Sequence, residues 1–239
     1  MSGHSKWHKI KHDKGSADAK KSSLFTKLGQ AISIVARQGG GDIETNFNLR
    51  LAVEKAKQAN IPKENIERAI KKGTGETQGD EIEEIIYEAF GPGNSAILIQ
   101  ALTDNKNRTV SSLRRIFNKF GGNLGGQNSV KWMFEQKGVV RIEKKEDLDL
   151  EELSLQAIDY GADDIKIEEE GLTIYTKIED LEKIKNSLEN KEIDLVSVGL
   201  EWIAKDLIEI NQPLQNRIGE IFSELDEDPD VEDYYSNIK

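Results

Sequence analysis

The sequence predicts an α+β protein, with an N-terminal three-helix bundle followed by two α+β domains. Apolar residues recur at helical spacing through the first third of the chain, whereas strand-like segments appear only after residue 80. Residues 136–204 follow the order β-α-β-β-α-β, which is the ferredoxin-like plan. We expect this last domain to be inserted into the middle one.

The first predicted domain, residues 1–79, is a basic arm joined to a helical bundle. Residues 1–22 show neither helical nor strand periodicity, and the first helix is expected from Leu24, where an apolar stripe begins. A second helix is predicted over 47–59. A third is predicted over 62–73, with proline at its first position and glycine at its end. Short connections between these helices favour a compact bundle.

The middle domain is predicted to be discontinuous, made of residues 80–135 and 205–239. The segment after residue 204 offers one helix and one strand, which a domain ending at residue 135 would lack. Two hairpin strands are expected at 82–90 and 95–103, followed by a helix at 109–120 and a half-buried strand at 130–134. After the inserted domain, a second helix is expected at 213–226 and a last strand at 231–238.

The inserted domain has the topology of RNA-recognition motifs, which stack bases on aromatic residues of their central strands. Its elements are expected at 139–142, 150–160, 164–168, 172–177, 180–189 and 195–198. The candidate central strand offers only Tyr175, and residues 136–204 carry 9 basic and 19 acidic residues. A protein partner or a dimer contact therefore suits this domain better than nucleic acid.

Charge is divided unevenly along the chain. Residues 1–75 hold 15 Lys/Arg and 7 Asp/Glu, a net of +8, whereas residues 76–239 hold 18 and 37, a net of −19. A cationic head on an acidic body suits a polyanionic partner that contacts one end of the molecule. This pattern predicts a nucleic-acid or ribosome binder.

Composition also narrows the class of protein. The chain has no cysteine, which excludes disulfides, thiolate nucleophiles and Cys-based zinc sites. No apolar run approaches the length of a membrane span, and the N-terminus lacks the apolar core of a signal peptide. A transit peptide is the alternative for a basic N-terminus, but the lysines, Asp13 and Asp18 argue against it. We expect a cytoplasmic protein without a membrane partner.

The arm is the first candidate nucleic-acid site because basic residues there surround an aromatic one. Lysines contact phosphates, and an indole can stack on a base. The residues concerned are Lys6, Trp7, His8, Lys9, Lys11, Lys14, Lys20, Lys21 and Lys27. The alternative is an ordinary basic tail whose tryptophan docks on the bundle.

The three histidines, His4, His8 and His12, have an i, i+4, i+8 spacing that could hold a metal on a helix. The neighbouring lysines repel a cation, so we predict no metal site.

Two further groups of basic residues are secondary candidates. Lys71 and Lys72 end the third helix, whose Glu64–Arg68 and Glu67–Lys71 spacings also fit i, i+4 ion pairs. A basic island in the acidic body contains Arg108, Arg114, Arg115 and Lys119. For this island, a solvated helix face and a second nucleic-acid contact are equally compatible with the sequence.

Nothing in the sequence supports catalysis or a cofactor. The glycine-rich segment 121–126 lacks the Gly-Lys-Ser/Thr ending of a phosphate-binding loop and fits a helix-to-strand turn better. All histidines lie within the first 12 residues, so no Ser/His/Asp arrangement is convincing. We predict a protein that is not an enzyme.

Several motifs, in order along almost the whole chain, resemble the YebC/PmpR family. They are Gly3-His4-Ser5-Lys6-Trp7, Ile10-Lys11, Asp18-Ala19-Lys20, Leu24-Phe25-Thr26-Lys27-Leu28, Lys55-Ala56-Lys57, Ala59-Asn60-Ile61-Pro62, Asn65-Ile66-Glu67-Arg68-Ala69-Ile70-Lys71-Lys72-Gly73, Tyr87-Glu88, Gly91-Pro92-Gly93, Thr103-Asp104-Asn105-Lys106-Asn107-Arg108-Thr109, Gly121-Gly122-Asn123-Leu124-Gly125 and Trp132 with Phe134. The resemblance implies three domains. It departs at Ser23, Gly29-Gln30 and Asn48, which weaken the basic face of the bundle, and at Asn128, where glycine is usual.

The resemblance implies a non-enzymatic regulator of gene expression. Bacterial members are described as probable transcriptional regulators that bind DNA. Mitochondrial relatives are translational activators, and some bacterial members resemble ribosome-associated factors that relieve stalling. The alternative to a DNA-binding regulator is therefore a translation factor that contacts ribosomal or transfer RNA. The acidic body favours this alternative somewhat, because basic ribosomal proteins would complement it.

Overall fold

The computed structural model describes residues 18–76, 82–145, 148–191 and 193–239, with side chains from Leu24 onward. The chain divides into two compact units, Met1–Phe134 with Ala204–Lys239 and, separately, Glu135–Ile203. Helices come first and two sheets follow, so the predicted α+β class is confirmed. Among the described residues, no helix is long and apolar enough to cross a membrane.

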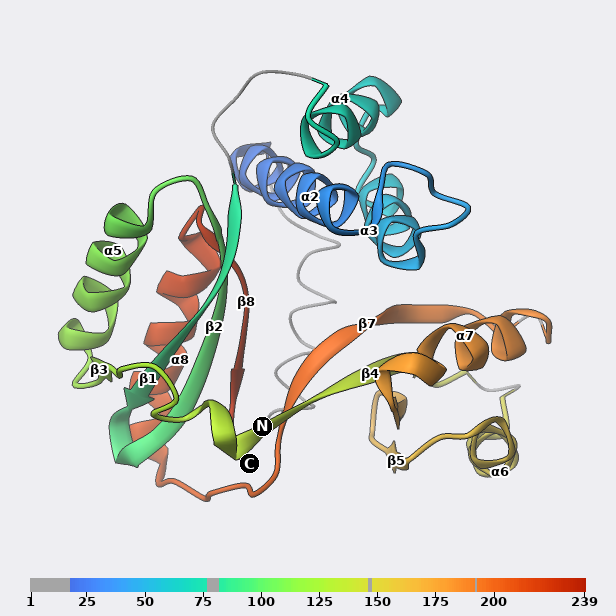
Figure 1. The fold of residues 1–239 in the computed structure, drawn as a ribbon. Coiled ribbons are helices and arrows are strands. Elements are labelled where there is room, and N and C mark those ends of the chain that lie inside the picture. Colours follow the sequence, from blue (N-terminus) through green and yellow to red (C-terminus); the bar gives the residue numbers. More distant parts are fainter. Residues whose placement is uncertain (1–17, 77–81, 146–147, 192) are drawn as a thin grey trace. The chain divides into compact units, whose positions relative to one another are not determined.

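The first unit begins with α2 (Asp18–Gly39), α3 (Phe47–Gln58) and α4 (Lys63–Gly73), which lie beside one another in Figure 1. Their apolar faces form one core of buried residues, which includes Leu28, Ile32, Leu49, Val53, Ile66 and Ala69. Helices α2 and α4 approach so closely that a Cβ on Gly73 would lie 2.2 Å from the Ser33 carbonyl oxygen. The Ser33 hydroxyl donates to the Ala69 carbonyl oxygen at 2.8 Å across the same contact.

Asn46 fixes the turn between α2 and α3. Its side-chain oxygen caps α3 by accepting the Leu49 N–H at 3.0 Å, while its amide donates to the carbonyl oxygens of Val35 and Gly40 at 2.9 and 2.8 Å. One buried side chain thus satisfies the end of one helix and the start of the next.

Two predicted helix boundaries were wrong. Helix α2 begins at Asp18, six residues before the predicted start at Leu24, because its first turns are polar and leave no apolar period to detect. Pro62 has φ −55° and ψ 139°, so it is the N-cap of α4 rather than its first helical residue.

The rest of the first unit is a four-stranded sheet with two helices packed on it. The strand order is β3-β1-β2-β8, and all the pairs are antiparallel. The elements are β1 (Glu83–Gly91), β2 (Ser95–Thr103), α5 (Lys106–Lys119), β3 (Asn123–Leu124), α8 (Gln212–Glu227) and β8 (Val231–Ser236). Strand β8 pairs with β2, so segments from both sides of residues 135–203 share one sheet.

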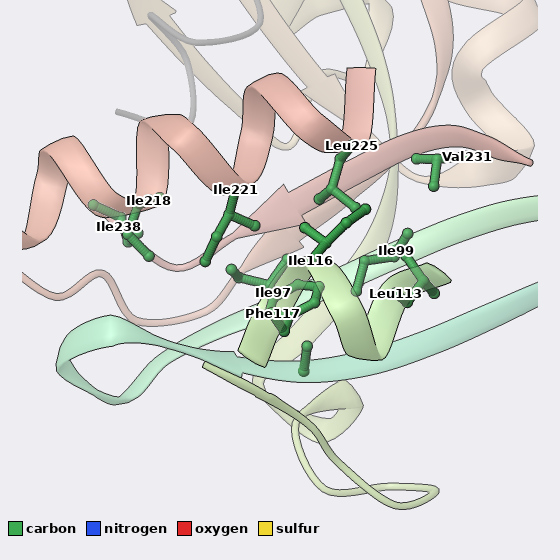
Figure 2. Close-up of a cluster of buried hydrophobic side chains, with 11 residues drawn as sticks. Ile97, Ile99, Leu113, Ile116, Phe117, Ile218, Ile221, Leu225, Val231 and Ile238 are labelled. Atoms are coloured by element: carbon green, nitrogen blue, oxygen red, sulfur yellow. The ribbon is translucent and has the colours of Figure 1, made fainter. Parts of the chain in front are cut away.

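Helices α5 and α8 meet over strand β2, as Figure 2 shows. Ile97 and Ile99 of β2 contact a buried cluster from the two helices, formed by Leu113, Ile116, Phe117, Ile218, Ile221 and Leu225. Both helices lie where they were predicted, over 109–120 and 213–226.

The predicted strand over 130–134 was wrong. Residues Lys131–Met133 form a short 3-10 helix, and β4 begins only at Phe134. Burial does alternate, because Val130 and Phe134 are buried while Trp132 is 66% exposed. The N–H groups of Val130 and Lys131 donate to the Glu88 carboxylate instead of a neighbouring strand, and this diverts the backbone from the extended form.

The second unit contains the predicted β-α-β-β-α-β order in a sheet of order β5-β6-β4-β7, the ferredoxin-like topology. Its elements are β4 (Phe134–Glu143), α6 (Leu150–Tyr160), β5 (Asp164–Ile167), β6 (Gly171–Thr176), α7 (Leu181–Glu189) and β7 (Leu195–Ala204). Inside it, Arg141 is only 2% exposed and its Nη2 donates to Glu201 Oε2 at 2.9 Å. Burial raises the pKa of nearby Tyr175 to about 12.

Candidate nucleic-acid interface

Most of the predicted arm site lies outside the described residues. Lys6, Trp7, His8, Lys9, Lys11 and Lys14 all precede residue 18, as do all three histidines. Lys20 and Lys21 belong to helix α2, but their side chains are not among those described. A binding role for the arm therefore stays a prediction.

Lys27 lies on α2 and contacts the end of helix α8. Its Nζ donates to the Asp226 backbone carbonyl oxygen at 3.0 Å. Carbonyl groups in the last turn of a helix have no partner within the helix and attract cations. Lys27 thus has a structural role, because it joins the helical bundle to the sheet part of the first unit. The Lys55–Glu232 ion pair at 3.8 Å and the buried cluster of Ile34, Ile82 and Leu102 make further contacts of this kind.

Lys71 and Lys72 end helix α4 and are exposed. Of the predicted ion pairs on this helix, neither Glu64–Arg68 nor Glu67–Lys71 forms; the structure instead pairs Lys63 with Glu67 at 3.7 Å. Within the described part of the chain, Lys71 and Lys72 make no ion pair. Their ammonium groups face solvent and are available to an anion.

Arg108, at the start of α5, forms an ion pair with Asp230 of the C-terminal segment. Its Nη2 and Nε donate to the two oxygens of Asp230 at 2.7 and 3.1 Å, and Nη2 also reaches Asp104 at 2.9 Å. The Thr109 hydroxyl donates to Asp230 at 2.8 Å. Asp230 is 3% exposed, so this clamp closes over a buried charge. The hydrogen bonds to Asp230 raise the pKa of Arg108 above its ordinary value.

Of the other three predicted cations on α5, two form ion pairs and one does not. Lys119 and Arg115 both contact Glu224 of α8, at 2.7 and 3.5 Å, and the contact with Lys119 lowers the pKa of Glu224. Arg114 is exposed and makes no ion pair with any described residue. Of the four predicted contacts on α5, Arg114 is the one whose charge remains available.

The glycine-rich segment after α5 is a turn. Gly121 has φ +83°, a left-handed conformation that favours glycine, and a Cβ on Gly122 would lie 2.6 Å from the Phe90 carbonyl oxygen. The left-handed backbone at Gly121 and the close approach at Gly122, rather than phosphate binding, account for glycine at these two positions.

Glu88 anchors the loop over residues 127–131, a role that the sequence analysis did not predict. The buried carboxylate, on β1, accepts the N–H groups of Asn128, Val130 and Lys131 at 2.6 to 2.7 Å. Burial disfavours its charged form, but these hydrogen bonds outweigh burial and lower the pKa of Glu88. A carboxylate inside an apolar strand was the available signal in the sequence.

Comparison with known proteins identifies the family. A model of the TACO1/YebC N-terminal domain matches residues 5–76, and a model of the second and third domain of TACO1/YebC proteins matches residues 82–238. A probable transcriptional regulatory protein of Thermotoga petrophila is 49% identical over 239 residues, covering 100% of this chain and 94% of that protein. One from Natranaerobius thermophilus is 45% identical, covering 99% and 96%.

One solved structure is similar to this chain in both sequence and fold. The crystal structure of a conserved hypothetical protein of Aquifex aeolicus, Aq1575, superposes with a TM-score of 0.86 at 40% identity. The match covers 93% of this chain and 91% of that one. The family models, the similar sequences and the shared fold lead to the same conclusion: this chain belongs to the TACO1/YebC family.

Proposed function

We propose that this protein is a non-enzymatic regulator of gene expression that binds nucleic acid, in the first instance a DNA-binding transcriptional regulator. The observation that carries the proposal is the charge division, a head of net +8 on a body of net −19. Relatives across the full length are named probable transcriptional regulatory proteins, which supports the same class.

The contacts are proposed to be electrostatic and led by the arm. Lys6, Lys9, Lys11 and Lys14 supply the first contacts, and Lys71 and Lys72 on α4 the next. On α5, Arg114 adds a third contact, while Arg108, Arg115 and Lys119 act mainly through the carboxylates that they pair with. Lysine contacts to phosphate release counterions, so the affinity should fall steeply with salt.

A second function, a ribosome-associated translation factor, is favoured by one observation. The acidic body complements the basic surfaces of ribosomal proteins, whereas it would be repelled by bare DNA. In this version the same arm contacts ribosomal or transfer RNA.

Crosslinking in growing cells, followed by sequencing of the attached nucleic acid, tests the proposal. The wild type is compared with a variant in which Lys6, Lys9, Lys11 and Lys14 are alanine. The matched control carries Lys144, Lys166, Lys177 and Lys183 as alanine, which removes the same charge from exposed positions in residues 135–203. Discrete promoter DNA that depends on the arm indicates a transcriptional regulator. Ribosomal or transfer RNA indicates the translation factor, and equal recovery from all three proteins contradicts both.

A further inference from the structure

Trp132 is an exposed aromatic side chain that lies two positions from a buried residue on either side. Its side chain is 66% exposed, while Val130 and Phe134 on either side are 0% and 4% exposed. Leaving an indole in water forfeits roughly 1.5–3 kcal/mol of burial free energy that a large apolar side chain can supply. An isolated exposed apolar residue needs no explanation by itself, so the proposal depends on how this one is held.

The backbone that carries Trp132 is fixed from two sides. From β1, the Glu88 carboxylate accepts the N–H groups of Val130 and Lys131, both at 2.7 Å. From the end of β7, Lys205 donates its Nζ to the Trp132 carbonyl oxygen and its N–H to the Met133 carbonyl oxygen, both at 2.9 Å. The indole therefore stands on an ordered support and does not belong to a free loop.

The only polar atom of the indole is already satisfied inside the loop. Trp132 Nε1 donates to the Ser129 carbonyl oxygen at 3.2 Å. A partner therefore needs no acceptor for this N–H and can use the ring faces alone. Stacking on a flat ring is the interaction that this arrangement leaves available.

The charge of the surrounding sequence favours an anionic strand over an acidic or neutral protein. Residues 105–134 contain no Asp or Glu and six basic residues, namely Lys106, Arg108, Arg114, Arg115, Lys119 and Lys131, within a chain of net charge −11. Lys106, Arg108, Arg115 and Lys119 pair with carboxylates from other segments, while Arg114 makes no ion pair with any described residue. The buried charge of Glu88 is compensated by its N–H donors. Lys131 directly precedes Trp132 in the chain, and Lys205 Nζ donates to the Trp132 backbone carbonyl oxygen.

We propose that Trp132 is a stacking platform for an unpaired base of single-stranded nucleic acid. The inference rests on the proposed function, because it assigns the site that reads the base rather than the phosphates. Exposed amides of Gln127 and Asn128 in the same loop offer hydrogen bonds to a base edge. The lysine arm supplies the salt-dependent part of the affinity, and Trp132 supplies a part that salt does not screen.

The test measures the affinity of the full chain for fluorescent single strands, RNA and DNA of one sequence, and for the same strands made abasic. Trp132→Leu removes the aromatic ring, and Trp132→Phe retains one. We expect Trp132→Leu to bind base-containing strands about tenfold more weakly, with Trp132→Phe close to wild type. All three proteins should bind abasic strands equally. The weakening should be the same at every salt concentration.

A strand carrying 5-iodouracil supplies an independent readout. Irradiation should crosslink wild-type protein within the peptide that contains Trp132. Comparable thermal melts of the variants will show that the loop, which Glu88 holds, has kept its fold. If Trp132→Leu binds every strand like wild type while the arm variant loses affinity, this inference fails and the proposed function stands. If the wild type binds no nucleic acid, both fail. A loss that is equal for base-containing and abasic strands also overturns base stacking.

Discussion

Helices α4 and α5 both carry a run of basic residues, yet their charges are used differently. On α4, Lys71 and Lys72 are exposed and make no ion pair within the described part of the chain. On α5, Arg108 clamps buried Asp230, and Arg115 and Lys119 share Glu224. A cation that holds the fold together has less charge to offer a phosphate. Counting basic residues therefore overstates how many are available for binding.

The largest expected effect comes from breaking the clamp on α5. Arg108→Ala leaves Asp230, 3% exposed, without its cationic partner. We expect a loss of about 2 kcal/mol in the free energy of unfolding, a value already reduced because half of the Arg108 side chain is exposed. Chemical denaturation measures the loss. Arg108→Lys should recover only part of it, because lysine lacks the two-pronged geometry.

The nucleic-acid affinity of the Arg108→Ala variant tests whether Arg108 also contacts the ligand. If Arg108 serves the fold, then folded Arg108→Ala protein should bind nucleic acid like wild type. Normal stability with weakened binding would place Arg108 in the interface and reverse the distinction between α4 and α5.

Glu88→Gln tests whether a charge also holds the loop after α5. The amide keeps one acceptor oxygen and places an NH2 donor where the other carboxylate oxygen accepts an N–H, so at least one backbone donor loses its partner. We expect a loss of about 1.5 kcal/mol in unfolding free energy at pH 7. Because folding lowers the pKa of Glu88 from its ordinary 4.5, its contribution is present above that pH and is lost as pH falls through the folded pKa. The difference between Glu88→Gln and wild type should therefore shrink in acid denaturation series. A difference that is constant down to pH 3 would contradict a charged anchor.

Lys71→Ala with Lys72→Ala tests the exposed cations of α4. We expect little change in stability and a lower nucleic-acid affinity, with the slope of log affinity against log salt reduced by about 2 if both lysines contact phosphate. Lys177→Ala with Lys183→Ala, on exposed lysines in residues 135–203, is the charge-matched control. An equal effect of the two double variants would indicate general electrostatics rather than a contact on α4.

The smallest effect is expected from Arg115→Ala with Lys119→Ala. Both side chains are exposed, and such surface pairs contribute little to stability. The thermal melt should be unchanged within its reproducibility, and so should binding, because their charge is shared with Glu224. Arg114→Ala is the neighbouring comparison and should weaken binding more than this pair.

The comparison also explains what the sequence could and could not predict. Helices α5 and α8 followed directly from apolar periodicity, because Leu113, Phe117 and Ile221 each occupy a buried position. The Arg108–Asp230 clamp joins residues separated by 122 positions, and no local pattern indicates such a pair. The basic island was therefore recognised, but the use of its charges was not.

One of the errors in local structure had the same origin, in a contact that is distant along the chain, and another had a local cause. Alternation of Val130, Trp132 and Phe134 predicted a strand, but Glu88, some 40 residues earlier, takes the N–H groups that a strand would use. Helix α2 begins at Asp18, in a polar segment that shows no apolar periodicity. Periodicity detects burial, and it fails where a hydrogen bond or a cap sets the backbone.

The most direct test of the central claim, that the basic head binds nucleic acid, is the salt dependence of affinity for three full-length proteins. These are the wild type, the variant with Lys6, Lys9, Lys11 and Lys14 as alanine, and the variant with Arg114, Arg115 and Lys119 as alanine. Four lost phosphate contacts should reduce the salt slope of the arm variant by about 3 to 4, and the α5 variant should lose no more than about 1. A full slope in the arm variant together with a large reduction in the α5 variant would contradict the account.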